Sequence, residues 1–301
     1  MSTPRITSSM IHRGVLADLN EIAAKVSRTQ LKLSSGKEIL RPSDDPFGTG
    51  RALTLRAELE GLAQYRRNTT DAEGWTTATD TALGTLTDLA QRARELLLRG
   101  ATGTTPQTER EKIAGEIDQL IATAKDTANS TYAGRSLFAG TATATKPYGT
   151  ASDAYLGDGG DIVRSIGPGV SVIVNARGSD ALGDGTDGKL LNTLRDISAH
   201  LRGTTPADSA ALSTSDIVAV DRSIDGLLDV RAQIGAIASR LESADNRLAE
   251  LEENARGLLS ETEDADMAAT IVDYSMQQSV YQSALRAGAG IVQTSLLDFL
   301  R

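Results

Sequence analysis

The chain has 301 residues and a net charge of −9, and aromatic residues make up 3% of it. This charge disfavours a polyanionic partner such as nucleic acid, because phosphate binding relies on clustered Lys and Arg. The chain has no cysteine, which excludes disulfides and thiolate metal sites. Large spherical cores draw much of their buried area from aromatic side chains. The composition therefore favours an elongated helical body.

No stretch reaches the ~18 continuous apolar residues that a membrane-spanning helix needs. The first twenty residues also lack the apolar run of a secretory signal peptide. We therefore expect no membrane span, and a protein that either stays in the cytosol or leaves it without a cleaved signal.

The two ends of the chain carry matching helical patterns. Residues 5–40 predict one long amphipathic helix, whose end is marked at 34–36, and residues 267–299 predict another. Each apolar stripe is narrow and cannot bury itself in one helix, so each end needs a partner, and the simplest partner is the other end. Such paired ends indicate assembly. The residues expected at the assembly interface are Leu16, Leu19, Ala23, Val26, Leu33, Ile271, Tyr274, Tyr281, Leu285, Val292, Leu296 and Phe299.

A short connector follows the first helix. Pro42 should stop a helix, because proline lacks an N–H group and clashes with the preceding turn. Asp45 and Pro46 favour a restart, since Asp caps free N–H groups and Pro suits the first helical position. We expect helices at 46–67, 76–99 and 108–130.

The composition shifts after residue 133 toward Gly, Thr, Asp and Ser. Apolar residues alternate with others at 170–175, and Gly167, Pro168 and Gly169 precede them. This pattern predicts a β-hairpin from residues 162–166 and 170–174. We interpret residues 141–188 as a small β-rich insertion.

Helical patterning returns after Lys189. A seven-residue apolar repeat continues through residues 220–248 and predicts a long helix in coiled-coil-like packing. Its members are Val220, Leu227, Ile234, Leu241 and Leu248. The predicted fold is mainly α: an elongated bundle of long antiparallel helices, with the terminal helices paired as a coiled coil and a small β-rich inserted domain. The expected domains are a terminal pair (1–40 with 262–301), a helical rod (41–140 with 189–261) and the insertion (141–188).

No pattern in the chain argues for catalysis, and we expect no cofactor and no metal. His12 and His200 are the two histidines, and both fit exposed positions. The acidic residues after position 260 fit a helix N-terminus, with Ser260 as cap and Glu263 completing a capping box, better than a cation site. Adjacent Asp44 and Asp45 fit caps in a proline-bounded turn.

Two segments carry a resemblance to a known family. Residues 33–46 resemble the N-terminal segment of the bacterial flagellin superfamily, and residues 263–301 resemble its C-terminal segment. The motif residues are Arg41, Pro42, Ser43, Asp44, Asp45, Pro46, Glu263, Asp264 and Asp266. The resemblance implies that the two ends pair as helices and form the inner tube of an axial filament, while the central chain makes outer domains.

Within the superfamily, residues 132–148 and 295–301 resemble the branch that forms the hook–filament junction. This resemblance implies a structural adaptor that self-assembles through its terminal helices. The implied partners are copies of itself in a ring, flagellin on one side, the hook-proximal junction protein on the other, and an export chaperone. The implied location is the extracellular flagellum, after export without a cleaved signal peptide. A filament flagellin is the alternative, and an enzyme or a cytosolic coiled-coil scaffold is a remote one.

Overall fold

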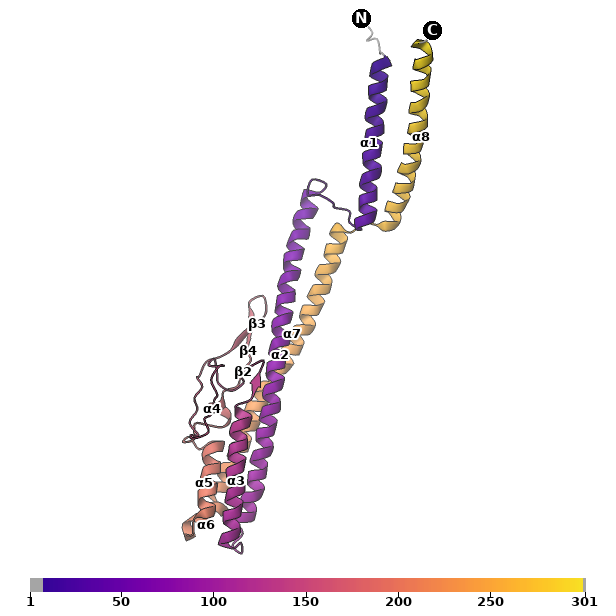
Figure 1. The fold of residues 1–301 in the computed structure, drawn as a ribbon. Helices are drawn as coiled ribbons and strands as arrows, with labels where there is room; N and C mark the ends of the chain where they lie inside the picture. The colour runs from indigo at the N-terminus through magenta and orange to yellow at the C-terminus, as the bar shows by residue number, and fades with distance from the viewer. Residues whose placement is uncertain (1–7, 300–301) are drawn as a thin grey trace. The chain divides into compact units, whose positions relative to one another are not determined.

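The computed structural model describes residues 8–299, without the side chains of 8, 9, 11, 12 and 290–299. Figure 1 shows a mainly helical chain, which confirms the predicted fold class. The helices are α1 (Ser8–Ser35), α2 (Pro46–Gly100), α3 (Gln107–Ala128), α4 (Gly178–Ala181), α5 (Leu190–Arg202), α6 (Pro206–Ser213), α7 (Ser215–Glu263) and α8 (Met267–Phe299). The strands are β1 (Thr131–Tyr132), β2 (Arg135–Ser136), β3 (Val163–Gly167) and β4 (Val170–Ile173).

The chain divides into two compact units. The terminal unit takes in the described residues up to Gly61 and from Glu252 onward, and the rod unit comprises Leu62–Leu251. Both boundaries fall inside long helices, α2 and α7. The three-part division into terminal pair, rod and insertion stays a prediction.

In the terminal unit, α1 and α8 pack side by side and run antiparallel, so that the start of α1 lies beside the end of α8 (Figure 1). The Thr29 hydroxyl donates a hydrogen bond to Gln277 Oε1 at 2.8 Å. Further along, a Cβ atom added at Gly288 would lie 3.3 Å from Val15 Cγ1. The glycine thus permits a close approach of the two helices, as small residues do at helix crossings.

In the rod unit, α2 and α7 run antiparallel and are joined by three arginine–aspartate pairs: Arg66–Asp245 at 3.2 Å, Arg231–Asp80 at 2.7 Å and Arg94–Asp221 at 2.5 Å. The predicted seven-residue repeat of α7 is confirmed, because all five of its members are buried. Its first four members pack in one core with residues of α2, α3 and α5.

The prediction of separate helices at 46–67 and 76–99 is wrong, since α2 is continuous. Threonines and one tryptophan face the core where the apolar pattern weakens. The hydroxyls of buried Thr69, Thr76 and Thr79 donate to backbone carbonyls four residues earlier, at 2.9–3.1 Å. Such bonds satisfy the polar atoms inside the helix, so polar residues fill positions that the apolar pattern leaves empty.

Strands occupy less of the predicted β-rich insertion than expected. The predicted hairpin is confirmed as β3 and β4, which pair antiparallel around the turn at 168–169. The rest of 141–188 is irregular chain with the short helix α4 and an isolated bridge between Tyr148 and Tyr155. A second hairpin, β1–β2, precedes the insertion and was not predicted.

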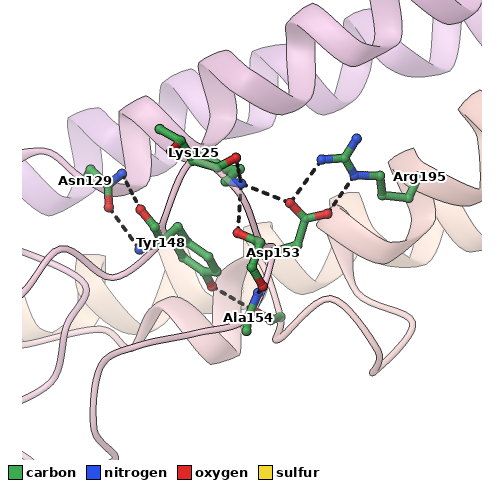
Figure 2. A network of polar contacts seen from close by, with 9 residues as sticks. Lys125, Asn129, Tyr148, Asp153, Ala154 and Arg195 are labelled. Atoms are coloured by element: carbon green, nitrogen blue, oxygen red, sulfur yellow. Dashed lines mark hydrogen bonds and ion pairs between the residues drawn. The ribbon is translucent and has the colours of Figure 1, made fainter.

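A buried polar network holds the irregular chain of residues 141–188 against helices α3 and α5 (Figure 2). The Lys125 ammonium on α3 donates to the carbonyls of Thr150 and Ser152 and pairs with Asp153 at 3.1 Å. Arg195 on α5 pairs with the same carboxylate at 2.6 Å. These charge-assisted bonds take the place of strand pairing.

Tyr148 anchors the same segment (Figure 2). Its backbone N–H and carbonyl both bond to the Asn129 side chain, at 3.0 and 2.9 Å, and its hydroxyl donates to the Gly183 carbonyl at 2.6 Å. Burial of the side chain raises the pKa of the Tyr148 hydroxyl well above its usual range. The phenol therefore stays a hydrogen-bond donor.

Replacing Lys125 with Met should lower the free energy of unfolding by about 3 kcal/mol, because a buried charge pair is broken and two carbonyls lose their donor. Urea denaturation of the full chain measures this. The matched control is Lys112→Met on the same helix, whose side chain is 75% exposed and should change stability by less than ~0.5 kcal/mol. Equal effects of the two substitutions would contradict the structural role of Lys125.

Candidate assembly interface

The contact between α1 and α8 follows one narrow stripe on each helix, which we call the interhelical seam. Its residues are buried or half-buried and recur every three or four positions, the spacing of a coiled coil. Small and polar residues take part in the seam beside apolar ones, which brings the backbones close. The seam comprises Val15, Leu19, Ile22, Val26, Thr29 and Leu33 on α1, and Thr270, Tyr274, Gln277, Tyr281, Ala284 and Gly288 on α8.

The predicted interface residues divide between this seam and the outer surface. The seam contains Leu19, Val26, Leu33, Tyr274 and Tyr281, while half-buried Ala23 lies at its edge. Three of the predicted residues are exposed in the single chain, because Val15, Thr270 and Ala284 occupy the seam beside them, and their place in the assembly interface stays a prediction. The three are Leu16 (59%), Ile271 (52%) and Leu285 (43%). The side chains of Val292, Leu296 and Phe299 lie outside those described.

Apolar side chains remain exposed on α8 after it has packed against α1. Val272, Met276 and Val280 follow each other at intervals of four residues, and their exposed fractions are 66%, 58% and 50%. On a helix this spacing forms one continuous ridge, which we call the outer ridge. A helix that is apolar on more than one side is typical of an element with more than one neighbour.

A compact joint connects the ends of α1 and α7 with the start of α8. Gly36 follows α1 with φ +69° and donates to the Lys32 carbonyl at 2.8 Å, which ends the helix. Two backbone bonds then tie the segments together: Glu38 N–H to the Glu263 carbonyl at 2.7 Å, and Ala265 N–H to the Gly36 carbonyl at 2.9 Å. Backbone hydrogen bonds therefore hold the joint together in addition to any side-chain contacts.

Charged side chains reinforce this joint. The Lys37 ammonium donates to Glu263 and to Asp264, both at 2.6 Å, and Arg56 on α2 also pairs with Glu263. The Glu263 side chain is buried, with 7% of its surface exposed. The bonds to Asp264 and Glu263 raise the pKa of Lys37, and those from Lys37 and Ser260 lower the pKa of Asp264. Both groups thus stay charged around neutral pH.

The predicted capping box at Ser260 is wrong. Ser260 lies within α7 and Glu263 ends it, because the apolar pattern of α7 continues to that point. The cap of α8 is Asp266, whose Oδ1 accepts from the N–H groups of Ala268 and Ala269 at 2.9 and 3.1 Å. The family-motif residues Glu263 and Asp264 are instead the partners of Lys37.

The turn before α2 agrees with the predicted caps. Asp44 accepts from the Arg41 N–H at 3.0 Å, and Asp45 Oδ1 accepts from the N–H groups of Phe47 and Gly48 at 3.1 and 2.9 Å. A Cβ atom at Gly48 would lie 2.9 Å from the Asp45 carboxyl carbon, so the glycine makes room for the cap. The motif 41–46 is thus a turn followed by a helix start.

The two histidines are the remaining candidates for catalysis or metal binding. His200 is half-buried, which corrects the expected exposed position, and its Nδ1 lies 2.7 Å from Asp216 Oδ2. The His12 side chain is outside those described. Among the side chains that the structure describes, no group of three or more His, Asp or Glu could hold a metal ion. No helix among the described residues is long and apolar enough to cross a membrane.

Two family models match the chain and together cover both terminal regions. The bacterial flagellin N-terminal helical region matches residues 6–143, and the C-terminal helical region matches residues 217–300. The chain is also 30% identical to a flagellin of Bacillus subtilis, over 95% of this chain and 97% of that protein. The chain belongs to the bacterial flagellin family. The predicted resemblance is confirmed, and the chain is a structural component of the flagellum.

Similarity extends to a particular branch of the flagellin family. The chain is 26% identical to flagellar hook-associated protein 3 of Escherichia coli, over 98% of this chain and 99% of that protein. Its fold resembles that of a hook-associated protein from Vibrio parahaemolyticus, with a TM-score of 0.68 and 23% identity over 73% of this chain and 100% of the other. A FlgL structure from Xanthomonas campestris aligns over 68% of this chain and 99% of the other, with a TM-score of 0.60 and 18% identity.

Glu263→Gln should loosen the joint, because Arg56 loses its charged partner and Lys37 loses one of its two, at a buried position. Hydrogen–deuterium exchange should show about tenfold faster exchange in peptides that span 36–40 and 263–266. Glu261→Gln, an exposed position on the same helix end, is the matched control and should leave both peptides protected. Unchanged protection in Glu263→Gln would mean that backbone pairing alone holds the joint.

Proposed function

We propose that this chain is the structural adaptor that joins the flagellar hook to the filament, and that it acts by self-assembly through its terminal helices. The observation that carries the proposal is the outer ridge, which stays exposed after α1 and α8 have packed together. Burying a Val or Met side chain contributes ~1.5–3 kcal/mol. Three such side chains on one helix favour a further neighbour.

A second copy of the chain is the simplest such neighbour. The remaining predicted interface residues, Leu16, Ile271 and Leu285, are exposed as well. Ile271 and Leu285 lie on the opposite flank of the interhelical seam from the outer ridge, because successive helical residues are separated by about 100°. Contacts between unlike surfaces of identical chains generate a ring when the rotation closes. In this proposal, the terminal pairs of neighbouring copies pack around a common axis, and a ring of copies results.

Similarity along nearly the full length to flagellar hook-associated protein 3 supports the junction over the filament. Flagellin is the second candidate, which the similarity to the Bacillus subtilis protein favours. In the proposed role, flagellin binds on one side and the hook-proximal junction protein on the other. The chain reaches the extracellular flagellum without a cleaved signal peptide, with the help of an export chaperone, and it catalyses no reaction.

Deletion of the gene in the source bacterium separates the two candidates. A missing junction adaptor leaves intact hooks without filaments and sheds flagellin into the medium. A missing filament flagellin leaves hooks without filaments and no flagellin in the medium. The second result would overturn the proposed junction role.

Replacing Val272 and Met276 together with Glu should abolish function without unfolding the chain, because both side chains are exposed in the single subunit but buried in the proposed assembly. The double variant should be helical by circular dichroism and exported, yet fail to restore motility to the deletion strain. Val218→Glu, an exposed valine on α7 (56%), is the control and should restore motility. Full motility with the double variant would refute the outer ridge as an assembly surface.

A further inference from the structure

A cavity of about 590 Å³ lies in the rod unit and has no part in the proposed assembly through the terminal helices. Asp71 and Trp75 of α2, Tyr132 and Arg135 of the β1–β2 hairpin, and Arg164 of β3 contribute to its walls. Three separate elements therefore meet around it. Its walls combine two aromatic rings with charged groups, so they offer both stacking and ionic contacts.

Trp75 lines this cavity and carries a buried hydrogen-bond donor. Its side chain is buried, with 2% of the residue exposed, and its ring packs edge-to-face on Tyr132 with centroids 6.0 Å apart. The indole N–H has no hydrogen-bond partner among the described residues. Buried donors in folded proteins are nearly always paired, so this N–H group points to an acceptor that binds from outside the chain.

The charges around the cavity leave one guanidinium without a partner. Arg164 donates to Asp71 Oδ2 at 3.1 Å, so these two charges compensate each other. Arg135 is exposed, and its side chain has no hydrogen bond or ion pair with the described residues. The cavity therefore carries one net positive charge.

The hairpin positions Tyr132 over the indole. A Cβ atom at Gly74 would lie 2.2 Å from the Tyr132 hydroxyl, so glycine leaves the space that the phenol occupies. The turn between the strands holds Ala133 at φ +48° and Gly134 at φ +77°. A left-handed alanine is rare and clusters at functional sites. The indole N–H is buried beside this ring, so a ligand contacts it only when the half-buried Tyr132 ring tilts aside.

We propose that this cavity binds a carboxylate group. The Arg135 guanidinium presents parallel N–H donors that match the two oxygens of a carboxylate, and the indole N–H of Trp75 adds a third donor. A singly charged group fits better than a phosphate dianion, because the Asp71 carboxylate also lines the cavity and repels a second negative charge. The carboxylate comes either from a small free acid or from an acidic side chain of a protein segment.

Trp75 is the one tryptophan of the chain, so its fluorescence reports directly on this cavity. The full-length unassembled chain is titrated with acetate, with inorganic phosphate, with a capped Gly-Asp-Gly peptide and, as a neutral control, with a capped Gly-Asn-Gly peptide. At least one carboxylate should give a saturable change, and Arg135→Gln should weaken it about tenfold or more. Arg99→Gln should bind like the wild type, because Arg99 lies 24 residues along α2 from Trp75, or ~36 Å.

The outcomes separate the two sources and can overturn the proposal. Saturation by acetate, with or without the peptide, supports a small free acid, and saturation by the peptide alone supports a protein segment. The proposal fails if neither carboxylate saturates, if the Asn peptide or inorganic phosphate binds as tightly, or if Arg135→Gln leaves binding unchanged. The titration needs no assembly, so its result is independent of the proposed function.

Discussion

The close packing of α1 against α8 is the constraint on which the rest of the account depends. Two helices approach closely only where their facing side chains are small or can pair with each other. Gly288 opposite Val15, and Thr29 bonded to Gln277, meet this condition. Because the interhelical seam uses such residues, several of the larger apolar side chains of α8 remain on its outer surface. This packing thereby leaves the outer ridge exposed, and in the proposed assembly the next subunit covers it.

The joint around Lys37 and Glu263 fixes the end of α1 next to the start of α8. Backbone bonds between Gly36 and Ala265 and between Glu38 and Glu263 hold the end of α1 beside the start of α8. Buried Glu263 pairs with Lys37 and with Arg56 of α2. Loss of either partner would be costly, because a buried charge would be left incompletely compensated. The family-motif residues therefore have structural roles. Asp44 and Asp45 form the turn and the cap before α2, and Asp266 caps α8. Glu263 and Asp264 pair with Lys37.

Long periodic patterns predicted the architecture well, and local polar chemistry explains what they missed. The repeat from Val220 to Leu248 predicted α7 because each member is apolar and buried. The continuity of α2 could not be predicted, because Thr69, Thr76 and Thr79 are buried through hydrogen bonds to their own helix. The stripe at Thr270 and Gln277 was missed for a similar reason, since polar residues at seven-residue spacing carry no apolar signal. The irregular chain held by Lys125 and Tyr148 depends on contacts between distant residues, which spacing along the chain does not encode.

The central claim is that α1 and α8 of the same chain form the pair that enters the assembly. The natural chain has no cysteine, so Thr29→Cys with Gln277→Cys introduces a single pair at two side chains already in contact. After oxidation of assembled flagella and denaturation without reductant, gel electrophoresis distinguishes links within a chain from links between chains. The account predicts that nearly all cross-linked protein migrates as a single chain, with unimpaired motility. Cross-linked dimers as the main product would show that the terminal helices pair between subunits, and would contradict the account.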